Sequence, residues 1–205
     1  MKSFFDLFAD SYHELTRRGN IRCIAVTGML CALSMAIEGF TIEIPFAKIN
    51  FAYIAIASIG MLFGPVVSFL AGGICDILGY FVHPDGGFLP LYTLIGMLQG
   101  LLYGMILYRG SSSKLITDKT KKAQFVIRII CARLADVLII NLLINTAANL
   151  HYGFIPAQAY SVAIKARLIK NLLQLCADIP ILLILLPIVL EIYRKAFGRR
   201  RAAAE

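Results

Sequence analysis

Tryptophan is absent from this 205-residue chain, and charged residues make up only 16% of it, compared with about a quarter of a typical soluble domain. The hydrophobic fraction is 59% and the mean hydropathy is +0.78. This balance excludes an ordinary soluble domain and indicates a membrane protein that crosses the bilayer several times and folds as one unit. The net charge of +8 does not point to nucleic acid, because the basic residues lie in the tails and one loop rather than on a folded face.

The motifs of ATP hydrolysis, metal binding and nucleophilic catalysis are missing as well. The sequence has no G-x-x-x-x-G-K-S/T loop for nucleotide phosphates, and its three histidines are scattered without HExxH or Cys/His ligand spacing. Its five cysteines form no CxxC pair and lie in apolar segments, where we expect reduced, buried packing residues. We therefore predict that the chain is not an enzyme and holds no cofactor of its own. The histidines are His13, His83 and His151, and the cysteines are Cys23, Cys31, Cys75, Cys131 and Cys176.

Long hydrophobic runs are abundant in the sequence. Six of them are predicted to be transmembrane helices, so the expected fold class is an all-α membrane protein with six spans. The second run is short for a spanning helix, which usually needs about 20 residues. The first run begins only near Ile21 and no small-residue cleavage site follows it, so no cleavable signal peptide is expected. The predicted spans are Ile21–Ile37, Asn50–Phe63, Pro65–Val82, Phe88–Tyr108, Ala123–Leu150 and Ala159–Tyr193.

Lysine and arginine residues predict the orientation of these spans. They crowd into the loop Arg109–Lys122 and the C-terminal tail, whereas the loops on the opposite side carry only Lys48. Both termini are therefore expected in the cytoplasm. We divide the chain into an N-terminal extension (residues 1–20), a six-helix transmembrane domain (residues 21–193) and a basic cytoplasmic tail (residues 194–205).

The N-terminal extension carries aromatic and apolar residues at helical spacing. Phe4, Phe8, Tyr12 and Leu15 are separated by four, four and three positions, and the acidic residues lie off that stripe. The pattern fits an amphipathic helix on the membrane surface, and a disordered tail with a few aromatic residues fits equally well.

Three cations open the most apolar run of the chain. Lys165, Arg167 and Lys170 precede Leu172–Ile192, and the predicted orientation puts them at its outer end, against the positive-inside trend. Arg167 and Lys170 are three positions apart and therefore share one helical face. A cation at mid-membrane depth costs roughly 2.5–3.5 kcal/mol, which an anionic ligand would offset. Our main hypothesis is that these cations, with the adjoining Asn171, bind an anionic ligand; the alternative is that they snorkel to the membrane surface.

Polar side chains inside the other spans are candidates for a ligand pocket or for contacts between helices, and spacing does not separate the two. Asp76 lies in the third span, where a carboxylate is a functional candidate. Arg133 and Asp136 are three positions apart and are predicted to pair with each other, whereas Asp178 has no assigned role. The further pocket candidates are Asn50, Tyr92, Thr93, Gln99, Asn145 and Asn149.

A stripe of small residues on the first span, made of Gly28, Ala32 and Ala36, would let another helix approach closely. The stripe is either a docking groove for a partner subunit or a site of packing within the chain. The long first outer loop, Glu38–Asn50, is either a gate over an outer pocket or a simple linker.

Several short motifs occur in a fixed order along most of the chain. They are Lys48–Phe51, Gly60–Pro65, Ala71–Gly73 with Asp76, Pro84–Thr93, Gly100–Gly104, Asn145–Thr146, Tyr152–Gly153 and Ala166–Asn171. As an ordered set they resemble the S components of energy-coupling factor (ECF) vitamin transporters, of the folate type. The resemblance covers about Arg22 to Pro187 and departs from the folate pattern in two places. No aromatic residue follows Asn145-Thr146, and Leu91-Tyr92 replaces the usual Gly-Phe before Thr93.

The resemblance implies a substrate-binding subunit in a prokaryotic plasma membrane, with six helices, cytoplasmic termini and an outward-opening pocket capped by the first loop. It also implies a complex with a transmembrane coupling subunit and two ATPases, which would use the ATP. In that complex Ala32-x-x-x-Ala36 would contact the coupling subunit. Residues 21–193 would then form the substrate-binding domain.

Two hypotheses of different classes follow. The first is a non-enzymatic subunit that binds an anionic vitamin, with folate preferred; pantothenate, a smaller carboxylate, also suits the cations and a pocket without tryptophan. The second is a self-contained ion-coupled carrier or an intramembrane enzyme. The absence of an internal repeat argues against the carrier, and the absence of a coherent catalytic set argues against the enzyme.

Overall fold

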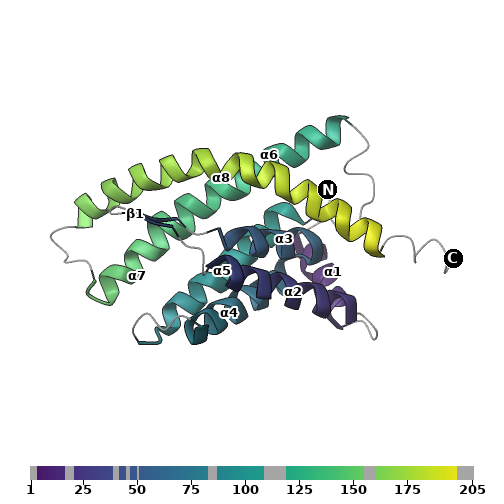
Figure 1. Cartoon of the computed structure of the whole chain (residues 1–205), viewed down its shortest axis with the longest axis horizontal. Helices are drawn as coiled ribbons and strands as arrows, with labels where there is room; N and C mark the ends of the chain where they lie inside the picture. The colour runs from purple at the N-terminus through teal and green to yellow at the C-terminus, as the bar shows by residue number, and fades with distance from the viewer. Residues whose placement is uncertain are drawn as a thin grey trace.

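A computed structural model describes residues 4–16, 21–38, 42–44, 47–49, 51–82, 87–108, 119–154 and 160–197. Within this part of the chain most residues are helical, and the helices pack into an elongated bundle (Figure 1). A short antiparallel hairpin of β1 (Ile42–Ile44) and β2 (Ala47–Ile49) lies in the predicted first outer loop. The helices are α1 (Phe4–Thr16), α2 (Ile21–Glu38), α3 (Tyr53–Phe63), α4 (Pro65–Val82), α5 (Pro90–Leu107), α6 (Lys119–Ala135), the π-helix η1 (Asp136–Ile144), α7 (Asn145–His151) and α8 (Tyr160–Phe197).

The predicted helical bundle is confirmed, apart from the β1–β2 hairpin, which was not predicted, and the helix bounds follow the hydropathy of the sequence closely. Four stretches are long and apolar enough to cross a membrane, namely α2, α4, α5 and residues Ile164–Phe197 of α8. α3 is apolar but only 11 residues long. The fifth predicted span corresponds to α6, η1 and α7, which follow one another without a break from Lys119 to His151. The count of six spans and the orientation of the termini stay predictions.

Glycine residues let α4 and α5 pack almost backbone to backbone. A Cβ atom at Gly100 would lie 2.0 Å from the backbone oxygen of Ser68, and one at Gly72 would lie 2.2 Å from the backbone oxygen of Gly96. The Ser68 hydroxyl donates a hydrogen bond to the Gly100 carbonyl oxygen at 2.7 Å. Small residues permit this close approach between helices in a membrane. The two helices therefore form the tightest pair in the bundle.

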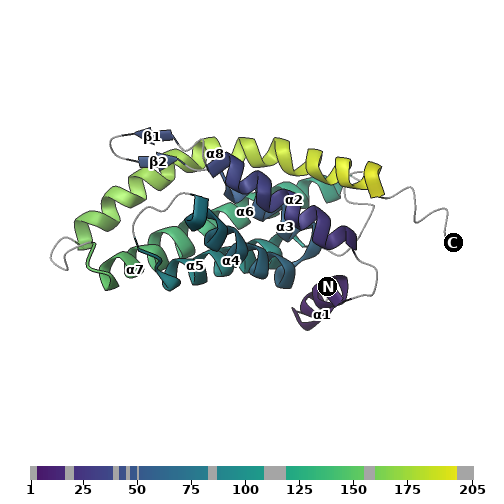
Figure 2. The same ribbon diagram turned by 60° about the horizontal axis from the view of Figure 1, so that its bottom comes forward.

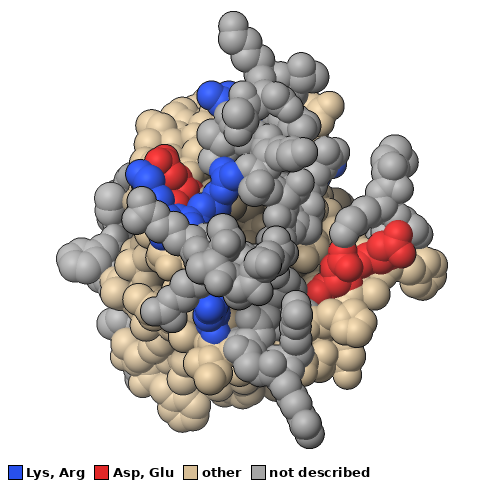
Figure 3. Space-filling model, turned by 90° about the vertical axis from the view of Figure 1, so that its right-hand side faces the viewer, with Lys and Arg blue, Asp and Glu red and all other residues tan. Residues whose placement is uncertain are grey.

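α1 and the C-terminal part of α8 lie at one end of the bundle, and α7 lies at the opposite end (Figure 1, Figure 2). At the first end the rings of Phe63 and Tyr193 meet edge to face, with centroids 5.6 Å apart. The guanidinium of Arg22 lies 5.8 Å from the ring centroid of Phe197. Figure 3 looks onto this end and shows several lysine and arginine side chains there, beside two separate groups of acidic side chains.

α1 is attached to this end through a buried serine. Ser11 donates from Oγ to the Phe63 carbonyl oxygen at 2.8 Å and accepts from the backbone N–H groups of Val66 and Val67 at 3.1 and 3.5 Å. The first amides of a helix have no acceptor within that helix. Ser11 therefore caps α4 from a distant part of the chain. Gly64, between α3 and α4, has a φ of +88°, and a Cβ atom there would lie 2.9 Å from the Ser11 side chain.

The rest of α1 turns aromatic side chains outward. Leu15 packs against the core, whereas Phe5 and Tyr12 are 81% and 57% exposed. The N-terminal extension is thus helical from Phe4 to Thr16, and contact of its exposed face with a membrane surface stays a prediction.

Replacing Ser11 by alanine is expected to lower the free energy of unfolding by about 1–2 kcal/mol, because the first amides of α4 lose their acceptor. Thermal unfolding of the purified protein in detergent measures the loss. Thr16→Ala is the matched control, since the Thr16 hydroxyl bonds only to the Tyr12 carbonyl of its own helix at an exposed position. Its effect should stay within about 0.5 kcal/mol. Equal losses in the two variants would show that Ser11 does not cap α4.

The cysteines are not all buried. Cys23, Cys31 and Cys75 lie in the core as predicted, but the prediction is wrong for Cys131 and Cys176, which are exposed on α6 and α8. The physical reason is that lipid tails are as apolar as leucine, so hydropathy does not separate the inward faces of a membrane helix from its outward faces.

Candidate ligand-binding site

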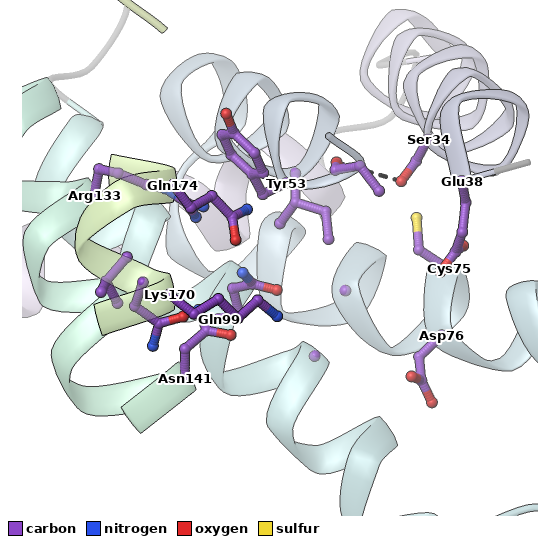
Figure 4. Close-up of a pocket in the computed structure, with 16 residues that line it drawn as sticks. Ser34, Glu38, Tyr53, Cys75, Asp76, Gln99, Arg133, Asn141, Lys170 and Gln174 are labelled. Carbon is purple, nitrogen blue, oxygen red and sulfur yellow. Dashed lines mark hydrogen bonds between the residues drawn. The ribbon is translucent and has the colours of Figure 1, made fainter. Parts of the chain in front are cut away.

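A cavity of about 250 Å³ lies between two groups of helices (Figure 4). One wall comes from α2, α3, α4 and α5, and the other from α6, η1 and α8. The wall includes the C-terminal turn of α2 and the first turn of α3, so the cavity lies in the half of the bundle away from α1. Its lining residues are Ser34, Glu38, Ala52, Tyr53, Ile56, Gly72, Cys75, Asp76, Gly96, Gln99, Arg133, Val137, Asn141, Lys170, Asn171 and Gln174.

Four of the predicted site residues meet in this cavity although they come from three different helices. Lys170 and Asn171 extend from α8, Asp76 from α4 and Gln99 from α5. Asn171 is buried, and Lys170 is half-buried. Figure 4 shows Asp76 and Lys170 on opposite walls, so the cavity presents a carboxyl group on one side and an ammonium group on the other.

Asp76 is held in place by a fifth predicted residue. The hydroxyl of Thr93 on α5 donates to Asp76 Oδ2 at 2.6 Å. This short hydrogen bond fixes the side chain, and the second carboxyl oxygen can accept from a ligand. Thr93 itself does not line the cavity, but it contacts the carboxyl group that does.

Arg167 and Tyr92 form a second group, one helical turn from Lys170. The Arg167 guanidinium donates to the Thr146 hydroxyl at 3.4 Å, and it also lies close enough to interact electrostatically with Tyr92. The Tyr92 ring stacks on that of Tyr152, with centroids 5.9 Å apart and an angle of 24° between the planes. The group therefore combines a cation with two stacked aromatic rings beside the cavity.

Asn145 and Asn149 are bonded to each other rather than to the cavity. The amide nitrogen of Asn149 donates to Oδ1 of Asn145 at 2.8 Å and to its backbone oxygen at 2.6 Å. Neither asparagine lines the cavity. The remaining candidate, Asn50, lies outside the described residues.

A buried charged network forms part of the wall and was only half predicted. Arg133 pairs with Asp136 at 2.5 Å, as the spacing predicted, and also with Asp178 on α8. The Arg133 guanidinium lies 3.7 Å from the ring centroid of Tyr53, whose hydroxyl donates to Asp178 at 2.8 Å. Tyr103 on α5 donates to Asp136 at 3.0 Å. The network thus joins α3, α5, α6, η1 and α8, and it gives Asp178 a partner.

Several lining residues were not predicted. Glu38 was expected to begin the first outer loop, but it ends α2 and lines the cavity together with Ser34, one turn before it. Gln174 lies four positions after Lys170 on α8 and therefore shares a helical face with it. This spacing could have identified Gln174 as a site residue. Tyr53 and Cys75 carried no sequence signal that separates them from ordinary core residues.

The chemistry of the cavity suits binding of a polar, charged molecule. Side-chain amides can both donate and accept, Lys170 can bind an anion and Asp76 can accept from N–H groups. Within the described ranges, no group of three or more His, Cys, Asp or Glu side chains is placed to hold a metal ion.

The small-residue stripe of α2 faces outward. Gly28, Ala32 and Ala36 are exposed, and a Cβ atom at Gly28 would meet no atom within 4 Å. Among the described residues, therefore, the stripe is not a site of close packing within the chain.

Comparison with known proteins gives a consistent result. The model of the family described as "ECF-type riboflavin transporter, S component" matches residues 18–194. The folate transporter FolT of Clostridium novyi is 28% identical over 131 residues, which are 64% of this chain and 67% of that protein. FolT of Streptococcus mutans is 34% identical over 92 residues, which are 44% of this chain and 50% of that protein.

A solved structure shares the fold. The crystal structure of FolT bound with folic acid superimposes with a TM-score of 0.58 at 28% identity, and the match covers 80% of this chain and 89% of that one. These relatives are transporters and not enzymes. The chain therefore belongs to the family of ECF-type transporter S components.

Proposed function

We propose that this chain is the substrate-binding S component of an ECF-type importer and that its substrate is folate. The observation that supports this most is the cavity, where Lys170, Asn171, Asp76 and Gln99 converge from α8, α4 and α5. The relatives named as folate transporters, and the similar structure that holds folic acid, support the choice of substrate. Folate carries carboxylates that Lys170 and Arg167 can bind, and ring N–H groups that can donate hydrogen bonds to Asp76.

The roles of the individual residues follow from their places. We propose that the ring system of the vitamin occupies the cavity and that its carboxylate tail extends toward Arg167. Tyr92, stacked on Tyr152 beside Arg167, would cover the middle of the ligand. Asn145 and Asn149 would shape the region without contacting the ligand, since they are bonded to each other.

Pantothenate is the second candidate, and one observation favours it. The only aromatic side chain among the described lining residues is Tyr53, and the Arg133 guanidinium already covers its ring at 3.7 Å. One face of this ring is therefore not available to a flat ring system, whereas a small aliphatic carboxylate needs no aromatic face.

Calorimetric titration of the purified protein decides between these ligands. We expect folic acid to bind much more tightly than pantothenate or riboflavin. Protein purified from cells grown on rich medium should also release a folate that mass spectrometry identifies. If pantothenate is the tighter ligand, or is the molecule released, the second candidate replaces the first.

We further propose six membrane spans with both ends of the chain in the cytoplasm of a prokaryotic cell. α3, and α6 with η1 and α7, would add two spans to the four that are long and apolar enough by themselves. The basic side chains at the end of the bundle that holds α1 support a cytoplasmic position for that end (Figure 3). The cavity would then open toward the outside.

Cysteine labelling tests this orientation. Single cysteines introduced at Asp85 and Gln158 should react with a membrane-impermeant reagent in intact cells, and one at Ser112 should react only after permeabilisation. The wild-type protein, which has five cysteines of its own, measures the background. Labelling of the Ser112 variant in intact cells would reverse the orientation and put the cavity on the cytoplasmic side.

The exposed stripe of α2 is the proposed contact with a transmembrane coupling subunit, which would work with two ATPases. Replacing Ala32 or Ala36 by leucine should leave ligand binding within about twofold and abolish ATP-driven uptake in proteoliposomes, because the partner helix is kept away. Leu33→Phe, on the same helix but off the stripe, is the control and should retain uptake; Leu33 is 50% exposed.

Loss of binding and uptake together in the Ala32 and Ala36 variants would contradict this role for the stripe. Uptake by the chain alone, without any ATPase, would instead support a self-contained carrier. Uptake that appears only with the partner subunits would support the S component.

A further inference from the structure

The buried network beside the cavity contains unequal numbers of positive and negative groups. Arg133 is 3% exposed, and Asp136 and Asp178 are both 0% exposed. If all three groups were ionised, one negative charge would be buried without a counter-charge. An uncompensated buried charge is so costly that the group takes up a proton instead.

Asp178 has the contacts of an ionised carboxylate. Both Nε and Nη2 of Arg133 donate to its Oδ2, and the Tyr53 hydroxyl donates to its Oδ1 at 2.8 Å. Each oxygen therefore has at least one donor, and the cation is in direct contact. Charge-assisted hydrogen bonds of this kind stabilise the ionised form.

The hydrogen bonds that Asp136 accepts from described residues all end on one of its two carboxyl oxygens. Its Oδ2 accepts from Nη1 of Arg133, from the Tyr103 hydroxyl at 3.0 Å and from the Asn141 amide at 3.4 Å. Its Oδ1 is fully buried, and no described residue donates a hydrogen bond to it. The side chain of Gln99 contacts the same carboxyl group.

We propose that Asp136 is a proton-binding site and that it holds a proton on Oδ1 in the folded protein at neutral pH. A protonated carboxyl group is the only form of aspartate that can donate a hydrogen bond, and the Gln99 side chain, which contacts this carboxyl group, carries an amide oxygen that can accept one. The network of Arg133, Asp178 and protonated Asp136 is then electrically neutral.

The groups that face Asp136 from the neighbouring helices agree with this assignment. Tyr103 on α5 donates to Asp136 and so keeps its own proton. The charge of Arg133 on α6 is balanced by Asp178 on α8, to which Tyr53 on α3 also donates. Lys170 on α8 lines the same cavity as Gln99 and Asn141. Because a protonated Asp136 carries no charge, it does not neutralise the ammonium group of Lys170, which can still bind an anion.

Two isosteric variants test the charge balance. Asp136→Asn replaces a neutral acid by a neutral amide, and its melting temperature should stay within about 3 °C of wild type. Asp178→Asn removes the carboxylate that accepts from Nε and Nη2 of Arg133 and from the Tyr53 hydroxyl, and its melting temperature should fall by about 10 °C or more. Equal losses in the two variants would overturn the proposal.

Infrared difference spectroscopy of the intact protein provides a readout that does not depend on the stability of a variant. The wild-type protein at neutral pH should show the carbonyl stretch of a protonated carboxyl group, and Asp136→Asn should remove it. Asp178→Asn should weaken it as well, because Asp136 then becomes the counter-charge of Arg133 and releases its proton. If Asp136→Asn does not fold, the band must survive in Asp76→Asn and Glu38→Gln. Absence of the band from wild type, or its loss in either of these last variants, overturns the proposal.

Discussion

The Gly100→Ala variant is expected to lose about 3 kcal/mol of the free energy of unfolding, or more. The new Cβ atom would lie 2.0 Å from the backbone oxygen of Ser68 and 2.6 Å from its carbonyl carbon. Both atoms belong to the backbone of α4, so no side-chain movement can relieve the overlap. The two helices must separate, which also breaks the hydrogen bond from the Ser68 hydroxyl to the Gly100 carbonyl oxygen.

Gly28→Ala is the matched control, because the same substitution on α2 meets no atom within 4 Å. Alanine is a better helix former than glycine, so this variant should match wild type or gain up to about 1 kcal/mol. Unfolding in detergent, followed by circular dichroism, measures both variants. A Gly100→Ala protein as stable as Gly28→Ala would mean that α4 and α5 are not in backbone contact.

Arg167→Ala is expected to weaken folate binding by roughly ten- to a hundredfold. In the proposed binding mode the change would remove a charge-assisted hydrogen bond to the ligand carboxylate, which is worth roughly 1.5–3 kcal/mol. Arg167→Lys should recover only part of this, since an ammonium group cannot reproduce the two-pronged contact of a guanidinium. Calorimetric titration with folic acid gives the dissociation constants.

Lys165→Ala is the control for Arg167, because Lys165 lies on the same helix but is exposed. It should bind folic acid within about twofold of wild type. An analogue without carboxylates should bind wild type weakly and lose little more when Arg167 is removed. If the analogue loses as much affinity as folic acid does, Arg167 supports the fold through Thr146 and does not contact the ligand.

The bundle was largely predictable because its helices are separated by residues that end helices. α4 runs from Pro65 to Val82, as predicted, since Gly64-Pro65 marks its start and a polar loop follows its end. The π-helical form of η1 was not predictable, because a shift in backbone hydrogen bonding leaves the hydropathy of a segment unchanged.

The site was predictable where the signal was local. Arg167, Lys170 and Asn171 stood out because cations are costly beside a hydrophobic run, and Lys170 and Asn171 do line the cavity. The pairing of Arg133 with Asp178 joins residues 45 positions apart, and no spacing rule reaches that far. Asn145 and Asn149, at the end of the fifth predicted span, need hydrogen-bond partners, as expected. Their partners are each other, one helical turn apart, and not a ligand site.

The contact of Ser11 with the turn between α3 and α4 also constrains how many times the chain crosses the bilayer. Ser11 precedes α2, and its partners Phe63, Val66 and Val67 follow it by 52, 55 and 56 positions, after α3. If this contact lies at a membrane surface, its partners are on the same side and the number of crossings between them is even. α2 is long and apolar enough to cross, and if it does, one further crossing would bring the chain back before Phe63. Only α3 lies there among the described helices, so a crossing by this short helix would satisfy that count, in agreement with the proposed six spans.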